Sequence, residues 1–246
     1  MLKDIAAGLL DLVYPRVCLL CRQPLTDSSF PYPLCPACFS RLQINRPPFC
    51  SRCSRPIATY QHLRCPHCAK NAPVFDRAWG VTLFDERMRH LIHLFKYGNK
   101  TGLRAFFGRL MADFIRLYHV PIYDFDGLLP APLHAARRRE RGYNQSDLLA
   151  ESLKNTFNIP IIKTAVRRLR NTSNQARLSQ KERWTNIARA FKINQSLHIR
   201  HKNILIIDDL LTTGATASEI TRVLKNAGAA NVCVLTLSIT NQPHDH

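Results

Sequence analysis

The run from Ile204 to Thr216 contains two adjacent carboxylates, three threonine hydroxyls and a glycine. Asp208 and Asp209 follow four aliphatic residues, a pattern typical of a central parallel strand that is buried on both faces. Ligands of open α/β sheets bind outside the carboxyl ends of such strands, where carboxylates can accept hydrogen bonds from ribose hydroxyls. The helix expected over about 215–227 would add free N–H groups and the positive end of its dipole, which suit a phosphate. The run therefore predicts a pocket for a sugar phosphate.

Taken one at a time, these residues are ordinary at a strand, a turn and a helix cap. As an ordered whole, the run resembles the ribose-phosphate signature of type I phosphoribosyltransferases and fills every position of it. The resemblance implies that Asp208 and Asp209 contact the ribose of phosphoribosyl pyrophosphate, with Mg²⁺ bridging ribose and pyrophosphate, and that the loop after them binds the 5′-phosphate. The expected ribose-phosphate site comprises Asp208, Asp209, Leu210, Leu211, Thr212, Thr213, Gly214, Ala215 and Thr216.

Eight of the nine cysteines form four Cys-x-x-Cys pairs in the first third of the chain. A pair with this spacing chelates zinc through a tight knuckle, and two pairs complete a tetrahedral thiolate site. Disulfides and redox-active pairs are less compatible with the chain, because it shows no secretory signal and no surrounding βαβ pattern. The spacing favours sequential pairing of the knuckles, and a crossed arrangement stays open. We expect two structural Zn²⁺ sites, with ligands Cys18, Cys21, Cys35, Cys38, Cys50, Cys53, Cys65 and Cys68.

Composition divides the chain into two expected domains, a Cys- and Pro-rich module over 1–73 and an α/β domain over 74–246. Residues 1–15 are expected to form a short amphipathic helix that packs on protein. No stretch reaches 18 apolar residues, so we expect no membrane span. Together with the missing secretory signal, this predicts a cytoplasmic protein.

Hydrophobic periodicity alternates between strand and helix along the second domain. Strands are expected over 75–84, 125–131, part of 159–169, 202–208 and 231–239, and helices over 86–97, 101–118, 145–157 and 215–227. The segment 170–189 is polar and only weakly periodic. Because alternating β and α segments form parallel sheets, the expected fold class is α/β. The resemblance to type I phosphoribosyltransferases implies that family's parallel sheet flanked by helices, here with a small N-terminal Cys₄ zinc-ribbon module.

Positive charge is concentrated in the second domain. The chain has a formal net charge of +18, and residues 134–200 contain 15 Lys and Arg against 4 Asp and Glu, or +11. Within this segment, a loop with four arginines follows an expected strand and precedes an expected helix. In the expected sheet this loop lies beside the Asp208 strand, where Arg137 and Arg141 could meet a pyrophosphate. A solvated basic loop is the alternative.

The arginine loop narrows the resemblance to the ComF/GntX family, which joins an N-terminal double zinc ribbon to a phosphoribosyltransferase domain. The shared motifs are Phe95-Lys96-Tyr97-Gly98, the run from Arg141 to Gln145, a spaced pattern over 172–186, and the ribose-phosphate run. The resemblance covers essentially the whole chain. It implies a competence protein that handles single-stranded DNA during natural transformation and works with a DNA helicase and a recombination mediator. An active phosphoribosyltransferase with an unknown acceptor is the alternative, and catalytic residues stay unassigned.

The resemblance also implies that Lys96 binds pyrophosphate and that 172–191 forms a flap over the pocket. Clustered Lys and Arg supply affinity for a nucleic-acid backbone, and Tyr143 and Trp184 suit base stacking. A buried tryptophan is the alternative for Trp184. The expected nucleic-acid contacts are Arg138, Arg139, Tyr143, Arg177, Lys181 and Arg183.

Overall fold

A computed structural model describes residues 16–25, 30, 32–60, 63–70, 72–98, 102–170, 180–194 and 198–241, with the backbone alone for 180–183. The amphipathic helix expected over 1–15 and the expected contact Arg177 lie outside the described residues. None of the described helices is long and apolar enough to cross a membrane.

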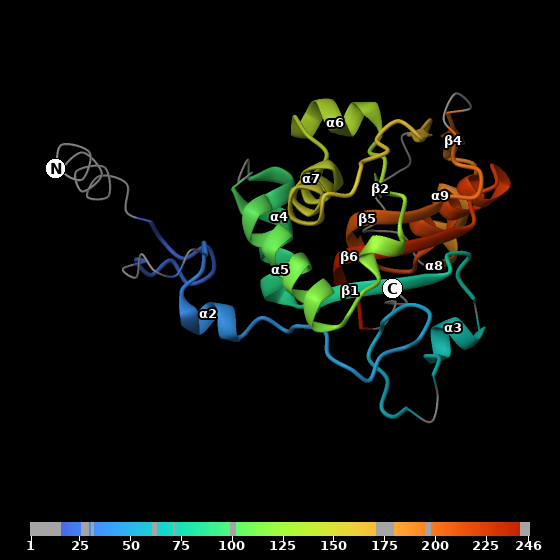
Figure 1. The fold of residues 1–246 in the computed structure, drawn as a ribbon. Coiled ribbons are helices and arrows are strands. Elements are labelled where there is room, and N and C mark those ends of the chain that lie inside the picture. The colour runs from blue at the N-terminus through green and yellow to red at the C-terminus, as the bar shows by residue number, and fades with distance from the viewer. Residues whose placement is uncertain are drawn as a thin grey trace.

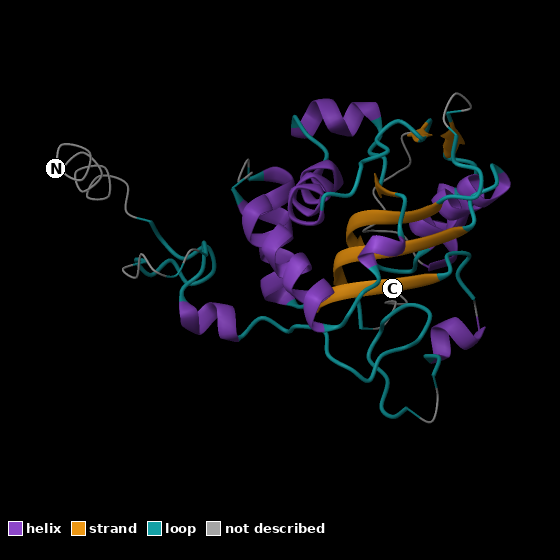
Figure 2. Cartoon of the chain, in the orientation of Figure 1, coloured by secondary structure: helices purple, strands orange, loops and turns teal. Residues whose placement is uncertain are grey.

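A four-stranded parallel sheet forms the centre of the second domain (Figures 1 and 2). The strand order is β1-β6-β5-β2, and the bounds are β1 (Arg77–Leu83), β2 (Gly127–Pro130), β5 (Asn203–Leu211) and β6 (Asn231–Ile239). Since every pair is parallel, the carboxyl ends meet at one edge, with Asp208 opposite Thr236. Placing β2 beside β5 confirms the expected neighbourhood of the arginine-rich segment and the two aspartates.

Helices cover both faces of this sheet. The aliphatic residues of β5 alternate between two cores, because successive side chains of a strand point to opposite faces. Leu205 and Ile207 pack against α4 (Glu86–Tyr97), α5 (Leu103–Leu117) and α7 (Gln145–Phe157), whereas Ile204 and Ile206 pack against α9 (Ala215–Asn226). A short 3₁₀ helix, η1 (Ile122–Asp124), precedes β2. The expected α/β class is confirmed.

Three expectations about local structure were wrong. β5 continues to Leu211 rather than ending at residue 208, so Asp208 and Asp209 lie within the strand. The arginine-rich segment is not a loop but contains α6 (Ala135–Arg141), which His134 caps through Nδ1 and Gly142 ends at φ 78°. Because α6 is helical, residues four apart share a face, which the loop interpretation could not provide.

The third correction concerns the strand expected within 159–169. After one parallel bridge between Ile161 and Leu128, the chain turns at 163–164, and β3 (Val166–Arg168) pairs antiparallel with β4 (Phe191–Ile193) in a separate two-stranded sheet. Pro160 lacks the N–H that a longer ladder along β2 would use. Part of the weakly periodic segment forms α8 (Gln180–Ile187), which contacts α9.

The zinc-ribbon segment, with α2 (Pro36–Ser40) and α3 (Pro66–Lys70), packs against the free edge of the sheet. The backbone N–H of Leu83 donates to Gln43 O at 2.8 Å, and that of Asn45 donates to Val81 O at 2.9 Å. The buried Asn45 carboxamide also donates to Ser54 O and to Gly80 O. These bonds cover the edge strand β1, whose polar backbone would otherwise be unpaired. The proposed division at residues 73 and 74 stays a prediction.

Candidate functional site

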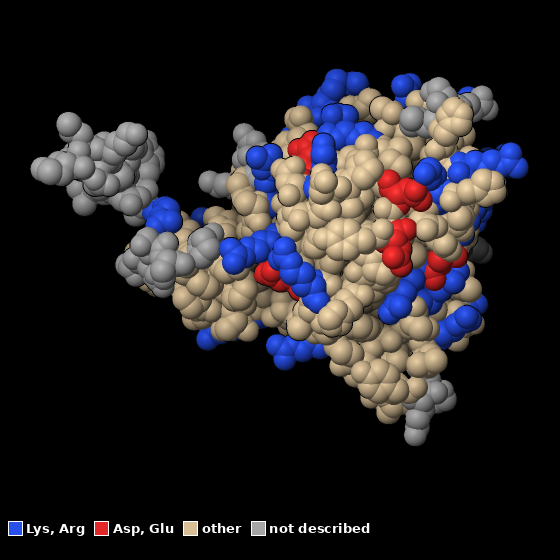
Figure 3. Space-filling model, viewed as in Figure 1, with Lys and Arg blue, Asp and Glu red and all other residues tan. Residues whose placement is uncertain are grey.

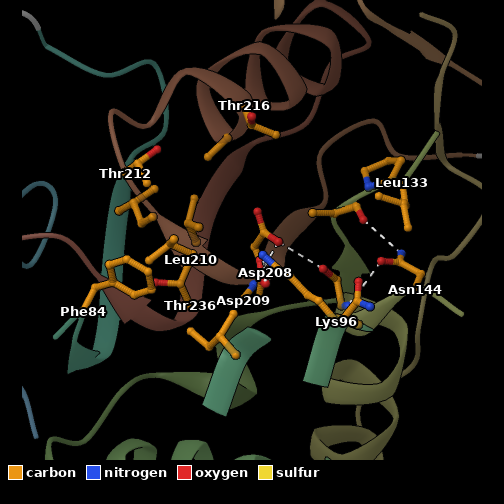
Figure 4. A pocket seen from close by; sticks show the side chains of 18 of the residues that line it. Phe84, Lys96, Leu133, Asn144, Asp208, Asp209, Leu210, Thr212, Thr216 and Thr236 are labelled. Carbon is orange, nitrogen blue, oxygen red and sulfur yellow. Dashed lines mark hydrogen bonds and ion pairs between the residues drawn. The ribbon is translucent and has the colours of Figure 1, made fainter. Parts of the chain in front are cut away.

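A cavity of about 760 Å³ opens at the carboxyl edge of the sheet (Figure 4). It lies among β5, the start of α9, α4 and α6. Of the residues expected to bind ribose phosphate or pyrophosphate, all but Thr213 line it: Lys96, Arg137, Arg141, Asp208, Asp209, Leu210, Leu211, Thr212, Gly214, Ala215 and Thr216. The fold therefore brings these segments, distant in sequence, to one place.

The two carboxylates form the floor of this cavity. Ser146 Oγ donates to Asp208 Oδ1 at 3.0 Å, and the N–H of Asp209 donates to the same oxygen at 2.9 Å. Burial and the neighbouring charge of Asp209 raise the pKa of Asp208 to about 7. Lys96 Nζ forms an ion pair with Asp209 Oδ2. Near neutral pH Asp208 is therefore only partly ionised, and a bound cation would favour its charged form.

The turn from Thr212 to Thr216 shapes the second side of the cavity. Gly214 adopts φ 80°, a left-handed conformation that favours glycine, and α9 begins directly after it. A Cβ at Gly214 would lie 3.3 Å from the ring of Phe75. Thr213 is buried, and its Oγ1 accepts the N–H of Ala215 at 3.3 Å. Thr213 thus holds the turn while its neighbours face the cavity, and the free N–H groups of α9 lie beside an anion site.

The third side is basic. Arg137 and Arg141, four residues apart in α6, both face the cavity. The guanidinium of Arg141 donates to Tyr97 Oη at 2.7 Å and to Gln145 Oε1 at 3.1 Å, and it lies 4.7 Å from the centre of the Tyr97 ring. These contacts fix the side chain before any ligand arrives.

Arg168 completes the basic side, and sequence reasoning missed it. It comes from β3 and lines the cavity. Burial, followed by the charge of Arg137, lowers the pKa of Arg168 to about 10. The only sequence signal was its place in an expected strand, which did not indicate which way that strand would turn. Ser146, which holds Asp208, was missed for a similar reason, since it lies on α7 rather than in a recognised motif.

The expected nucleic-acid contacts have more varied surroundings. Arg138 and Arg139 are exposed on α6, and Arg138 lies 3.7 Å from Asp147. Tyr143 is half-buried, and its hydroxyl donates to Phe95 O, which favours an anchoring role over base stacking. Trp184 is partly buried and packs against the α9 side of the core, so it is neither the fully buried tryptophan of the alternative nor a fully exposed ring. Lys181 and Arg183 belong to α8, where the structure describes the backbone alone.

The cysteines form two groups of four, and in each group the sulfur atoms lie within 4.8 Å of one another. The groups are Cys18, Cys21, Cys35 and Cys38, and Cys50, Cys53, Cys65 and Cys68. This arrangement agrees with sequential pairing of the knuckles and not with the crossed one. Four thiolates at this separation fit a closed, tetrahedral, structural Zn²⁺ site.

Comparisons with known proteins agree with this geometry. A model of the double zinc ribbon domain matches residues 9–73. Competence protein F of Haemophilus influenzae is 31% identical over 207 residues, which cover 82% of this chain and 88% of that protein. The DNA utilization protein YhgH of Escherichia coli K12 is 32% identical over 233 residues, or 93% and 99% of the two chains. This chain belongs to the ComF/GntX family.

The double zinc ribbon match covers the segment of this ComF/GntX chain that contains both cysteine groups. Among solved structures, the glutamine phosphoribosylpyrophosphate amidotransferase of Bacillus subtilis is 17% identical, with a TM-score of 0.39. The similarity covers 59% of the ComF/GntX chain and 30% of the amidotransferase.

Proposed function

We propose that this protein handles single-stranded DNA during natural transformation and that its cavity binds phosphoribosyl pyrophosphate with Mg²⁺. The names of its relatives, Competence protein F and DNA utilization protein, support a role in DNA uptake or use. The observation that carries the proposal is the meeting, in one cavity, of paired carboxylates, a helix N-terminus and the guanidinium groups of Arg137, Arg141 and Arg168.

The order of these groups across the cavity matches a ribose with an anion at each end. Figure 4 shows Asp208 and Asp209 between the turn that contains Thr212 and Thr216 on one side and Lys96 and Leu133 on the other. The turn would hold the 5′-phosphate, the carboxylates the ribose hydroxyls, and the basic side the pyrophosphate. Arg141 Nε is buried and has no acceptor among the described residues. An oxygen of a bound pyrophosphate would satisfy it.

The donor set also suits a hard cation. Asp208 and Asp209 offer carboxylate oxygens, which Mg²⁺ prefers, and Mg²⁺ is usually bound by one or two carboxylates together with substrate phosphates. Such an ion would neutralise part of the pyrophosphate charge. Lys96, which is paired with Asp209, would then be released toward the phosphates.

The DNA part of the proposal depends on basic side chains outside the cavity. Arg138 and Arg139 on α6 are exposed, as are Arg167, Arg170 and Lys192 on and beside the β3–β4 sheet. In Figure 3, Lys and Arg cover the region of α6 at the top of the molecule. Arg137 of α6 and Arg168 of β3 line the same cavity, so the α6 side lies next to the β3 side. We define this set of five exposed residues as the basic rim, and we infer that it follows the phosphates of a single strand.

The test for DNA measures the anisotropy of a labelled oligothymidine as KCl is raised. We expect wild-type binding to weaken with salt, with a slope that decreases by about 0.7 for each phosphate of the single strand that a variant no longer neutralises. The double variant Arg138→Ala/Arg139→Ala should lower the slope, whereas Arg104→Ala, which removes one exposed charge on α5, should not. Wild-type protein that shows no salt-sensitive binding at micromolar concentration would refute the DNA role.

The test for the cavity is separate. Calorimetry with phosphoribosyl pyrophosphate should show binding that needs Mg²⁺ and that Asp209→Asn weakens. If DNA binding persists while the wild type binds no phosphoribosyl pyrophosphate, the ligand assignment fails and the DNA role stands.

A second function, phosphoribosyl transfer to an acceptor, is favoured by the basic side of the cavity. Lys96, Arg137, Arg141 and Arg168 would stabilise charge on the departing pyrophosphate as the bond to the ribose C1 breaks. The acceptor would supply the new bond to C1 and lose a proton. Pyrophosphate release in the presence of nucleobases, amines or DNA tests this function, and its absence with all of them would refute it.

By resemblance, we propose a DNA helicase and a recombination mediator as partners, the zinc-ribbon unit as their docking surface, and the cytoplasm as the place of action. Co-purification of both partners with the tagged chain tests the first point. If the zinc ribbon is their docking surface, a variant that lacks it but keeps a folded second domain should co-purify with neither partner.

A further inference from the structure

Arg55 lies between the second cysteine group and the turn that forms the phosphate side of the cavity. Its side chain is buried, with 3% of its surface exposed. The guanidinium donates through Nε to Thr240 O at 3.1 Å, through Nη1 to Cys53 Sγ at 3.3 Å, and through Nη2 to Thr212 O. One planar group therefore contacts a zinc ligand, the first residue of the turn and the residue after β6.

The buried charge of Arg55 needs a negative charge nearby, and the metal site can supply it. A guanidinium stays protonated in proteins, and burying it is costly unless negative charge compensates. Among the described residues, no carboxylate forms an ion pair with Arg55. Four thiolates and one Zn²⁺ would carry a net charge of −2, and Cys53 is in contact with the guanidinium. The loaded zinc site is the counter-charge that the structure offers.

The position of the Thr212 carbonyl explains why this contact matters for an anion. Thr212 directly follows β5 and precedes the left-handed turn at Gly214. The N–H of Thr240 donates to Leu211 O at 3.1 Å, which joins the ends of β5 and β6. Arg55 adds a second link there, because it donates to the carbonyls of both Thr212 and Thr240. A carbonyl bound by Arg55 cannot turn into the cavity, where its oxygen would repel a phosphate.

We propose that Arg55 is a positioning residue that couples occupancy of the second zinc site to the shape of the phosphate-binding turn. With zinc bound, the thiolates hold the guanidinium, and the guanidinium holds the turn open to an anion. Without zinc, the guanidinium loses its counter-charge and the turn loses its anchor. The identity of the anion rests on the proposed function, whereas the coupling does not.

The decisive experiment measures hydrogen exchange in peptides that span 210–217, with no ligand present. In Arg55→Gln, we expect exchange there to be faster by about tenfold, because the carbonyl of Thr212 no longer accepts a hydrogen bond from a charged group. Removal of zinc from the wild type by a chelator should also make hydrogen exchange in the same peptides faster. The control is Arg52→Gln, since Arg52 belongs to the same knuckle and donates to Pro73 O, away from the turn. It should leave exchange over 210–217 unchanged.

Two further readouts separate this role from general support of the fold. Zinc release to a coloured chelator should be faster in Arg55→Gln than in Arg52→Gln. Affinity for phosphoribosyl pyrophosphate with Mg²⁺ should fall by about tenfold in Arg55→Gln and by less in Arg55→Lys, which keeps the charge but loses the fork. If Arg55→Gln does not fold, Arg55→Lys and chelation of the wild type supply the same comparison.

Unchanged exchange over 210–217, in the Arg55 variants and in the zinc-stripped wild type, would overturn the proposal. A wild-type protein that binds no phosphoribosyl pyrophosphate would refute the ligand assignment alone. The exchange data would still decide the coupling.

Discussion

Replacing Asp208 by Asn should stabilise the protein at high pH, even though it removes an expected ligand of the ribose. Burial, together with the charge of Asp209, raises the pKa of Asp208 from 3.8 to about 7. A shift of about 3 pH units corresponds to at most about 4 kcal/mol of unfavourable free energy when the carboxyl ionises in the folded state. Asn has no charge, and its Oδ1 can still accept the hydrogen bonds from Ser146 and from the backbone of Asp209.

Proton linkage gives the direction in which the stability of the wild type changes with pH. Between pH 4 and pH 7 the folded state holds a proton on Asp208 that the unfolded state has released, so the wild type loses stability as pH rises through this range. Asp208→Asn has no carboxyl at this position, so its stability should not decrease for this reason as pH rises. We expect the two proteins to unfold with similar free energies near pH 4, and the advantage of Asp208→Asn to grow by about 3 kcal/mol between pH 5 and pH 8, because about 2 pH units of the shift lie above pH 5.

Urea denaturation at pH 5, 6, 7 and 8 measures this difference. Asp126→Asn is the matched control, because the hydrogen bond from Lys202 lowers the pKa of Asp126. Its contribution is lost only as pH falls below the usual range of a carboxyl, so its profile should parallel that of the wild type between pH 5 and pH 8. A free-energy difference between the wild type and Asp208→Asn that is the same at pH 5 and pH 8 would refute the reasoning.

Three other predictions concern the cavity and the metal sites. Gly214→Ala should destabilise the turn by about 1–2 kcal/mol, because its φ of 80° disfavours side chains, and calorimetry should show weaker binding of phosphoribosyl pyrophosphate; Gly102→Ala, which meets no atom within 4 Å, should bind as the wild type does. Lys96→Met should weaken the same binding by about tenfold or more, since it removes a cation from the pyrophosphate side, and equal affinities would contradict that role. Cys65→Ser should halve the zinc content measured by mass spectrometry, because Cys65 belongs to one group only, and a content of two zinc ions would show that Cys65 is not a required ligand.

Local signals predicted much of the fold. The helices over 86–97 and 145–157 and the strand over 231–239 occur with the expected bounds, because hydrophobic periodicity and caps within each segment determine them. The expected strand at 202–208 was too short, since pairing with β6 extends it to Leu211. The helix α6 was missed because four arginines in seven residues give no apolar periodicity.

For the candidate site, the order of residues along the chain was informative only within motifs. The carboxylates, the glycine turn and the cysteine pairs are each contained in a few residues, so spacing alone indicates their chemistry. Arg168 and Ser146 enter the cavity from β3 and α7, which carry no recognised motif. No sequence pattern showed that their side chains would face Asp208.

By itself, the sequence determined the class of fold, the eight thiolate ligands in four pairs and the ribose-phosphate run, because these depend on side-chain type at short, regular spacing. The tertiary structure decided which knuckles share a site, which arginines face the carboxylates, and that Arg55 reaches from Cys53 to Thr212. These relations join residues far apart along the chain. They arise from packing of the zinc ribbon on the sheet edge and from burial of charge, which act only when the chain has folded.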